Sequence, residues 1–161
     1  MEIRSATDSD FEQIWLIFSE VVSLGDTYAF SPNTSKSEAY HIWMEVPQVT
    51  YVAVKTNQIL GTYYIKPNQI GLGSHVCNAG FMVATSARGE GIGRLMGEHS
   101  LIEARNLGFK AMQFNFVVST NQSAIKLWQR LGFKIVGTLP NAFQHQTLGF
   151  VDVYVMYQEL E

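Results

Sequence analysis

The chain has 161 residues, of which 47% are hydrophobic and 16% are charged. This balance predicts one folded domain over residues 1–161 with a real core, and it excludes an intrinsically disordered chain. The formal charge is −3 and no basic run is present, so we expect no nucleic-acid partner.

Residues 2–6 are expected to form a short strand, followed by a helix. Ser9 and Glu12 have the spacing of a capping box, in which each side chain satisfies an orphan backbone group. Apolar residues then recur on one helical face: Phe11, Ile14, Trp15, Phe18 and Val22. The next loop, 25–34, mixes polar and aromatic residues, and it is either a plain connector or a substrate-site wall that includes Tyr28.

A second capping box begins at Ser35 and starts a helix that stops at Pro47. Residues 49–55 alternate as a strand, and residues 56–58 have turn composition. Residues 59–66 then return as the second strand of an antiparallel hairpin.

A polar link over residues 67–74 leads to an apolar strand, 75–83. Asn78-Ala79-Gly80 interrupts the apolar pattern of this strand. A glycine inside a strand often marks a bulge or a close backbone approach. A bulge here would separate the strand from its neighbour and open a slot.

Three glycines at alternate positions follow that strand: Gly89, Gly91 and Gly93. An amphipathic helix follows them, with Ile92, Leu95, Met96, His99 and Ile102 expected on one side. A glycine-rich turn at a helix start presents backbone N–H groups without intrahelical partners, so it suits a phosphate or pyrophosphate. The Walker spacing fails because no Gly-Lys-Ser/Thr follows, and the dinucleotide spacing would need glycine at Arg94 or Met96.

Residues 111–118 are predicted to form a buried strand that carries one odd residue, Asn115. An amide in apolar surroundings needs a hydrogen-bond partner. Asn121 precedes another helix, with Ala124, Trp128 and Leu131 on one face and Gly132 as the stop.

The chain closes with a strand at 133–139, a loop at 140–148 and a strand at 149–159. The order of elements predicts an α/β domain with a mixed sheet and parallel pairing in its middle. The apolar segment 151–157 fits either a core strand or the edge of a homodimer.

The spacing Arg88-x-x-Gly91-x-Gly93 resembles the acetyl-CoA signature of the GCN5-related N-acetyltransferases (GNAT), Gln/Arg-x-x-Gly-x-Gly/Ala. Asn121, Ala124 and the ending Leu131-Gly132-Phe133 resemble the second motif of that family. The resemblance covers essentially the whole chain. It implies a mostly antiparallel mixed sheet with a central, splayed parallel strand pair, and acetyl-CoA as the acetyl donor.

The residues that this resemblance implies for the cofactor are Phe81, Met82, Val83, Arg88, Gly89, Glu90, Gly91, Ile92, Gly93, Arg94, Asn121, Ala124 and Trp128. A narrower resemblance, through NAGFMV, FNFVVSTN, LWQRLGF and VGTLPNAF, is to acetyltransferases that act on the proline analogue azetidine-2-carboxylate, and to their bacterial relatives. It implies catalytic roles for Asn78, Asn115 and Asn121, and substrate contacts from Asn78, Phe81, Asn115 and, by its place in the loop, Tyr28.

Two departures from the family pattern bear on mechanism. Trp128 stands where a tyrosine often serves as the acid, and an indole N–H cannot transfer a proton at neutral pH. The strand 75–83 lacks the glutamate that many relatives use, and His75 is more simply a residue at a strand start than a base. We therefore expect amides to position an amine that is deprotonated from solution, with a rate that rises with pH. Asn121 is equally well read as a helix cap, and Trp128 as a core residue.

The expected activity is direct acetyl transfer from acetyl-CoA to a small-molecule amine, such as a proline-like imino acid or an amino acid. The alternatives are a peptide or protein α-amine acetyltransferase, with residues 140–148 covering or forming its groove, and a non-catalytic acyl-CoA-binding module. Cys77 reads as a buried hydrophobe, and no spacing suggests a metal site. The N-terminus is not a signal peptide and no run spans a membrane, so we expect a cytoplasmic protein without a membrane partner.

Overall fold

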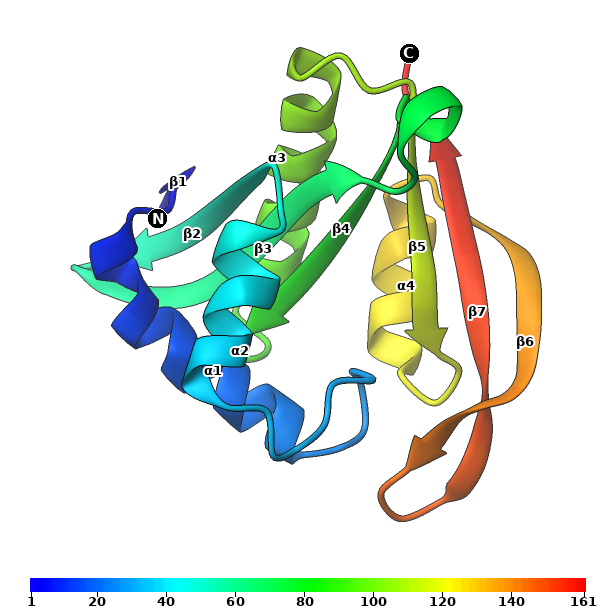
Figure 1. Cartoon of the computed structure of the whole chain (residues 1–161), viewed down its shortest axis with the longest axis horizontal. Coiled ribbons are helices and arrows are strands. Elements are labelled where there is room, and N and C mark those ends of the chain that lie inside the picture. The colour runs from blue at the N-terminus through cyan, green and yellow to red at the C-terminus, as the bar shows by residue number, and fades with distance from the viewer.

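A seven-stranded mixed sheet runs through the molecule in the order β1-β2-β3-β4-β5-β7-β6 (Figure 1). The computed structural model describes all of residues 1–161. Neighbouring strands pair antiparallel, except for the parallel pair β4 and β5. The mixed α/β sheet with a central parallel pair is therefore confirmed. Its strands are β1 (Glu2–Ser5), β2 (Val49–Lys55), β3 (Gln58–Pro67), β4 (Val76–Val83), β5 (Ala111–Val118), β6 (Lys134–His145) and β7 (Gly149–Glu159).

Two helices cover each face of the sheet: α1 (Phe11–Ser23) and α2 (Lys36–Tyr40) on one, α3 (Ile92–Asn106) and α4 (Gln122–Arg130) on the other (Figure 1). A π-helical turn, His41–Glu45, continues α2. Successive residues of β3 point to opposite faces. Trp43 donates a hydrogen bond to Thr62 at 3.0 Å, whereas a Cβ added at Gly61 would lie 2.8 Å from Met96 of α3. Even-numbered residues of β3 in this stretch therefore face α1 and α2.

Strands β4 and β5 separate soon after they begin. They share only the pairs Val76–Ala111 and Cys77–Met112, and their far ends stand apart in Figure 1. A splayed parallel pair was expected from the family resemblance, and the structure contains one. The opening leaves one edge of β4 without a partner strand at the centre of the sheet.

The bulge predicted at Asn78 to Gly80 is wrong in position. The register of β4 with β3 is continuous, whereas the β5–β7 register shifts between Phe114 and Val117 and leaves Asn115 out of the ladder. The other prediction for this glycine, a close backbone approach, is also not what the structure shows, because the close group is a side-chain ring. A Cβ added at Gly80 would lie 2.6 Å from the Tyr64 ring.

The start of α1 also differs from the predicted Ser9–Glu12 box. The backbone N–H of Thr7 donates to the Asp10 carboxylate at 2.7 Å, and a 3-10 turn over residues 8–10 precedes the helix. Arg4 donates to both oxygens of Asp10, at 2.8 and 2.9 Å, and this hydrogen bonding lowers the Asp10 pKa to about 2. Glu12 is exposed and pairs with Lys36 at 2.6 Å instead.

The loop predicted at 140–148 is mostly strand, because β6 continues to His145. The register jumps between Leu139 and Phe143, and Asn141 takes a φ of 52°. Pro140 is tolerated here because β6 is an edge strand, where a missing N–H costs no ladder hydrogen bond. Strand β7 is paired on both sides, so segment 151–157 is an interior strand, and a homodimer remains only a prediction.

The predicted inner face of α3 is partly wrong. Ile92 and Met96 are buried as expected, but Leu95 and Ile102 are 42% and 55% exposed. Small residues take the inner positions because α4 approaches closely: a Cβ added at Gly97 would lie 2.6 Å from Leu131. No helix of the structure combines the length and the apolar character that a bilayer crossing requires.

Candidate active site

A cleft of about 1050 Å³ passes through the sheet where β4 and β5 separate. Its walls include residues of both faces, such as Trp128 on the α4 side and Tyr64 on the α2 side. All residues predicted for the cofactor, the substrate and catalysis line this cleft, with the single exception of Glu90. A cleft that crosses a sheet lets two ligands meet from opposite faces.

The glycine turn forms an open cradle at the start of α3. Gly89 and Gly91 have φ values of 82° and 80°, which side chains rarely adopt, and a Cβ at either would have no atom within 4 Å. The first backbone hydrogen bond of this helix is the one that the Leu95 N–H donates to the Gly91 carbonyl at 3.1 Å. The amides between them make no backbone hydrogen bond, and Arg88 and Arg94 line the cleft beside them. Free N–H groups, open space and two cations fit a pyrophosphate.

The exposed edge of β4 is partly closed by Tyr28. Its hydroxyl donates to the Phe81 carbonyl at 2.8 Å and accepts from the Phe81 N–H at 2.7 Å. These are the backbone groups that β5 would pair if it had not diverged. Burial raises the pKa of Tyr28, so the hydroxyl stays protonated. The loop 25–34 is therefore a wall of the cleft and not a plain connector.

An amide cluster, made of Asn68, Asn78, Gln113 and Asn115, lies at the other end of the cleft. Asn78 is buried, donates to the Gln113 carbonyl at 2.9 Å and accepts from the Tyr64 hydroxyl at 3.3 Å. Asn115 donates to Asn68 at 2.7 Å and accepts from the Gln113 side chain at 2.9 Å. Asn115 is exposed at the β5 irregularity, so the predicted apolar surroundings are wrong, although it does have the expected partners. Hydrogen bonds thus link these residues in one network, of which Asn78, Asn115 and Tyr64 line the cleft.

Asn121 and Trp128 each have a structural role. The Asn121 side chain caps α4 by accepting from the Ala124 N–H at 3.4 Å. Trp128 is 7% exposed and its ring packs against Phe81 and Phe114 at centroid distances of 4.8 and 4.7 Å. Both residues also line the cleft. The cap and core interpretations are therefore confirmed, and neither excludes contact with a ligand.

Residues 12–133 match the Acetyltransferase (GNAT) family. The chain belongs to this family. It is 34% identical to the N-acetyltransferase aca1 of Schizosaccharomyces pombe, across 83% of this chain and 72% of that protein. It is 45% identical to a GCN5-related N-acetyltransferase from Kribbella flavida. The two structures superpose over 99% of this chain and 97% of that chain, with a TM-score of 0.94.

The fold also matches that of yncA from Salmonella typhimurium, solved with its cofactor acetyl-CoA, at 21% identity and a TM-score of 0.85 over 100% of this chain and 94% of that one. The GNAT assignment confirms the predicted fold, the enzyme class of N-acetyltransferase and acetyl-CoA as the donor. It favours the enzyme over the non-catalytic module.

Three charged residues that line the GNAT cleft were missed as site residues: Asp26, Lys66 and, on α4, Arg130. Lys66 lines it with its Nζ 5.4 Å from the centre of the Tyr64 ring. Asp26 is the one carboxylate that lines it, and its Oδ1 is buried without a hydrogen-bond partner. A buried oxygen of this kind can accept from a ligand N–H. Lys66 could have been found only from the β3–β4 register, which places it beside Asn78.

Two residues that sequence reasoning considered for chemistry lie outside the cleft. Cys77 is fully buried, and burial raises the pKa of its thiol to about 12, so it is not a nucleophile. His75 precedes β4 and its carbonyl accepts from the Lys110 N–H at 2.8 Å. The structure therefore agrees with the simpler predictions, in which Cys77 is a buried core residue and His75 is a residue at the start of a strand.

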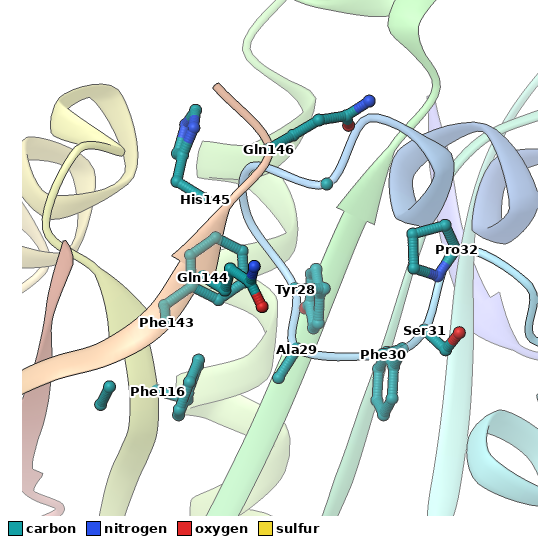
Figure 2. Close-up of a pocket in the computed structure, with 12 residues that line it drawn as sticks. Tyr28, Ala29, Phe30, Ser31, Pro32, Phe116, Phe143, Gln144, His145 and Gln146 are labelled. Atoms are coloured by element: carbon teal, nitrogen blue, oxygen red, sulfur yellow. The ribbon is translucent and has the colours of Figure 1, made fainter. Parts of the chain in front are cut away.

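A second cavity of about 420 Å³ adjoins the cleft between loop 25–32 and the end of β6. Figure 2 shows Phe116 and Phe143 near one another, facing the loop that carries Tyr28 and Phe30. Gln146 N–H donates to the Gly25 carbonyl at 3.1 Å and holds the hairpin turn against the loop. Tyr28 and Phe116 line both spaces, so the two spaces are neighbours with shared walls.

Proposed function

We propose that this GNAT enzyme acetylates the amine of a small molecule, and that its acceptor is an amino acid or a proline-like imino acid. The observation that carries the proposal is the cleft itself, which joins an anion cradle on one side of the sheet to an amide cluster on the other. The solved neighbours do not agree on one acceptor, since their names range from a ribosomal-protein-alanine N-acetyltransferase to a phosphinothricin acetyltransferase. The narrower resemblance and the polar groups of the cluster support a small, polar one.

The chain's own residues would hold the cofactor at two places. The amides around Gly91 and the Arg88 guanidinium would bind its phosphates, and the free edge of β4 at Val83 would face its arm. Acetyl-CoA supplies an activated acetyl group as a thioester. No covalent intermediate on the enzyme is required, because Cys77 is sealed in the core.

The acceptor side would position the amine rather than deprotonate it. Asn78 is fixed by two hydrogen bonds, so its orientation is set before any ligand arrives. Such preorganised dipoles contribute by alignment and by stabilising developing charge. The amide cluster contains no carboxylate, and the one carboxylate of the cleft, Asp26, lies in loop 25–34, outside that cluster; on this proposal the neutral amine comes from solution and the rate should rise with pH.

A peptide α-amine acetyltransferase is the second candidate, and the cavity in Figure 2 is the observation that favours it. The cavity is larger than a single proline ring requires and is walled by aromatic side chains, which could receive residues that follow an α-amine. The end of β6, within the segment 140–148 considered from the sequence, forms one of its walls.

A free-thiol release assay with acetyl-CoA tests the proposal. The acceptor panel holds azetidine-2-carboxylate, proline, primary amino acids, simple amines and short peptides, each at several pH values. Release with imino or amino acids supports the proposal. Release with peptides alone transfers the function to the second candidate, and release with no acceptor from a protein that binds acetyl-CoA contradicts both.

A further inference from the structure

The acceptor side of the cleft carries a lysine without a counter-ion. Lys66 lies near the end of β3, is half-buried, and takes part in none of the four ion pairs of the structure. Removing a charge from water without a partner is unfavourable. The position is therefore suited to a ligand that brings a negative charge.

The surroundings of Lys66 place its charge at the amide cluster. Its Nζ lies over the Tyr64 ring at 5.4 Å from the centroid, a cation–π distance that restrains the flexible side chain. The same Tyr64 donates through its hydroxyl to Asn78, and burial raises the Tyr64 pKa to about 12. Lys66 and Asn78 are also direct partners across β3 and β4, so their side chains share one face.

The other arginine and lysine side chains that line the cleft belong to the opposite side. Arg88 and Arg94 lie at the glycine cradle, and Arg130 lies on α4. Arg94 is also paired with Glu98 at 2.8 Å. Of the lysine and arginine residues that line the cleft, Lys66 is thus the one on the α1–α2 side of the sheet.

We propose that Lys66 binds the carboxylate of the acceptor and so selects amines that carry an α-carboxylate. The inference rests on the proposed small-molecule acceptor and deepens it. The ammonium would fix one end of the acceptor while Asn78 orients the nearby amine. A charge-assisted hydrogen bond in this partly desolvated position favours an acid over its neutral amide or ester.

The test compares azetidine-2-carboxylate with azetidine-2-carboxamide as acceptors for wild type, Lys66→Met and Lys66→Arg. Lys55→Met, which removes an exposed lysine at the end of β2, is the matched control. Because both acceptors are measured on each protein, general losses of activity cancel in the ratio of kcat/KM. Calorimetric titration of azetidine-2-carboxylate into each protein gives a binding readout without turnover.

In wild type the acid should be preferred. Lys66→Met should lower kcat/KM for the acid by about 10- to 100-fold, chiefly through KM, leave the carboxamide unchanged and weaken binding of the acid in calorimetry. Lys66→Arg should keep part of the preference. An acid preference that persists in Lys66→Met, or no preference in wild type, overturns the inference while the proposed function stands. If wild type acetylates no α-carboxylate amine, the proposed function fails and the inference fails with it.

Discussion

Replacing Gly80 with alanine would test how tightly the acceptor side of the cleft is built. A Cβ at this position would lie 2.6 Å from Cε2 of Tyr64 and 2.9 Å from its hydroxyl oxygen. Ordinary contacts begin near 3.4 Å, so the ring would have to move by about 0.8 Å. The ring cannot simply retreat, because Trp43 packs edge-on against it at 4.8 Å and is fully buried.

Overpacking of this kind costs about 1–3 kcal/mol of the free energy of unfolding. It would also displace the Tyr64 hydroxyl from Asn78, since that hydrogen bond is already 3.3 Å long. We therefore expect Gly80→Ala to raise KM for the acceptor several-fold. The affinity for acetyl-CoA should change little, because the cradle around Gly91 is formed by a separate turn.

Urea denaturation and calorimetry measure both quantities, and Gly137→Ala provides the control. Gly137 also lies in a strand without a positive φ, but a Cβ there meets no atom within 4 Å. The free energy of unfolding of the control should lie within about 0.5 kcal/mol of the wild-type value. If Gly80→Ala is as stable as Gly137→Ala and binds its acceptor normally, the Tyr64 ring does not press on β4 and the reasoning is refuted.

Other substitutions test separate parts of the structure. Gly91→Glu should abolish acetyl-CoA binding in calorimetry, because it puts a carboxylate into the anion cradle and strains a φ of 80°; unchanged affinity would remove the cradle assignment. Asn115→Ala should lower turnover more than cofactor affinity, and a change in thermal stability alone would make it a structural amide. Trp128→Phe should retain most of the activity, since its ring packs in an aromatic cluster; a loss as large as that of Asn115→Ala would give its N–H a chemical role. Asp10→Asn should lower the free energy of unfolding by roughly 1–2 kcal/mol at pH 7, allowing for solvent screening at Arg4. Because the folded pKa is depressed to about 2, the difference should fade as pH drops from about 4 to 2, and a constant difference would contradict it.

Local patterns were enough for much of the fold and for the cofactor side of the site. The limits of β2, β5 and β7 agree with the predicted ranges, and the capping box at Ser35 is present, with the Glu38 N–H donating to its hydroxyl at 3.1 Å. The glycine turn was recognisable because its chemistry lies within one short segment. Positive φ, open space and a helix start are all consequences of neighbouring residues.

The acceptor side depends on pairings between distant segments, which local patterns do not contain. Lys66 meets Asn78 through the β3–β4 register, and Tyr28 reaches Phe81 across 53 residues of sequence. The exposure of Leu95 has a similar cause, because the rotation of α3 is set by how closely α4 approaches Gly97. Periodicity alone identifies an apolar stripe but not the neighbour that will cover it.

The two sides of the cleft also differ in how their residues are distributed along the chain. The donor cradle comes largely from one stretch, residues 81–94, whereas the acceptor walls combine residues 25–32, Lys66 with Asn78, and residues 142–146. Changes at the tip of β6 or in the first loop can therefore reshape what is acetylated while the donor machinery stays intact. The chain is in this sense modular. If the proposed acceptor side is correct, substitutions in loop 25–32 or at the tip of β6 should change the acceptor preference and leave acetyl-CoA affinity unchanged.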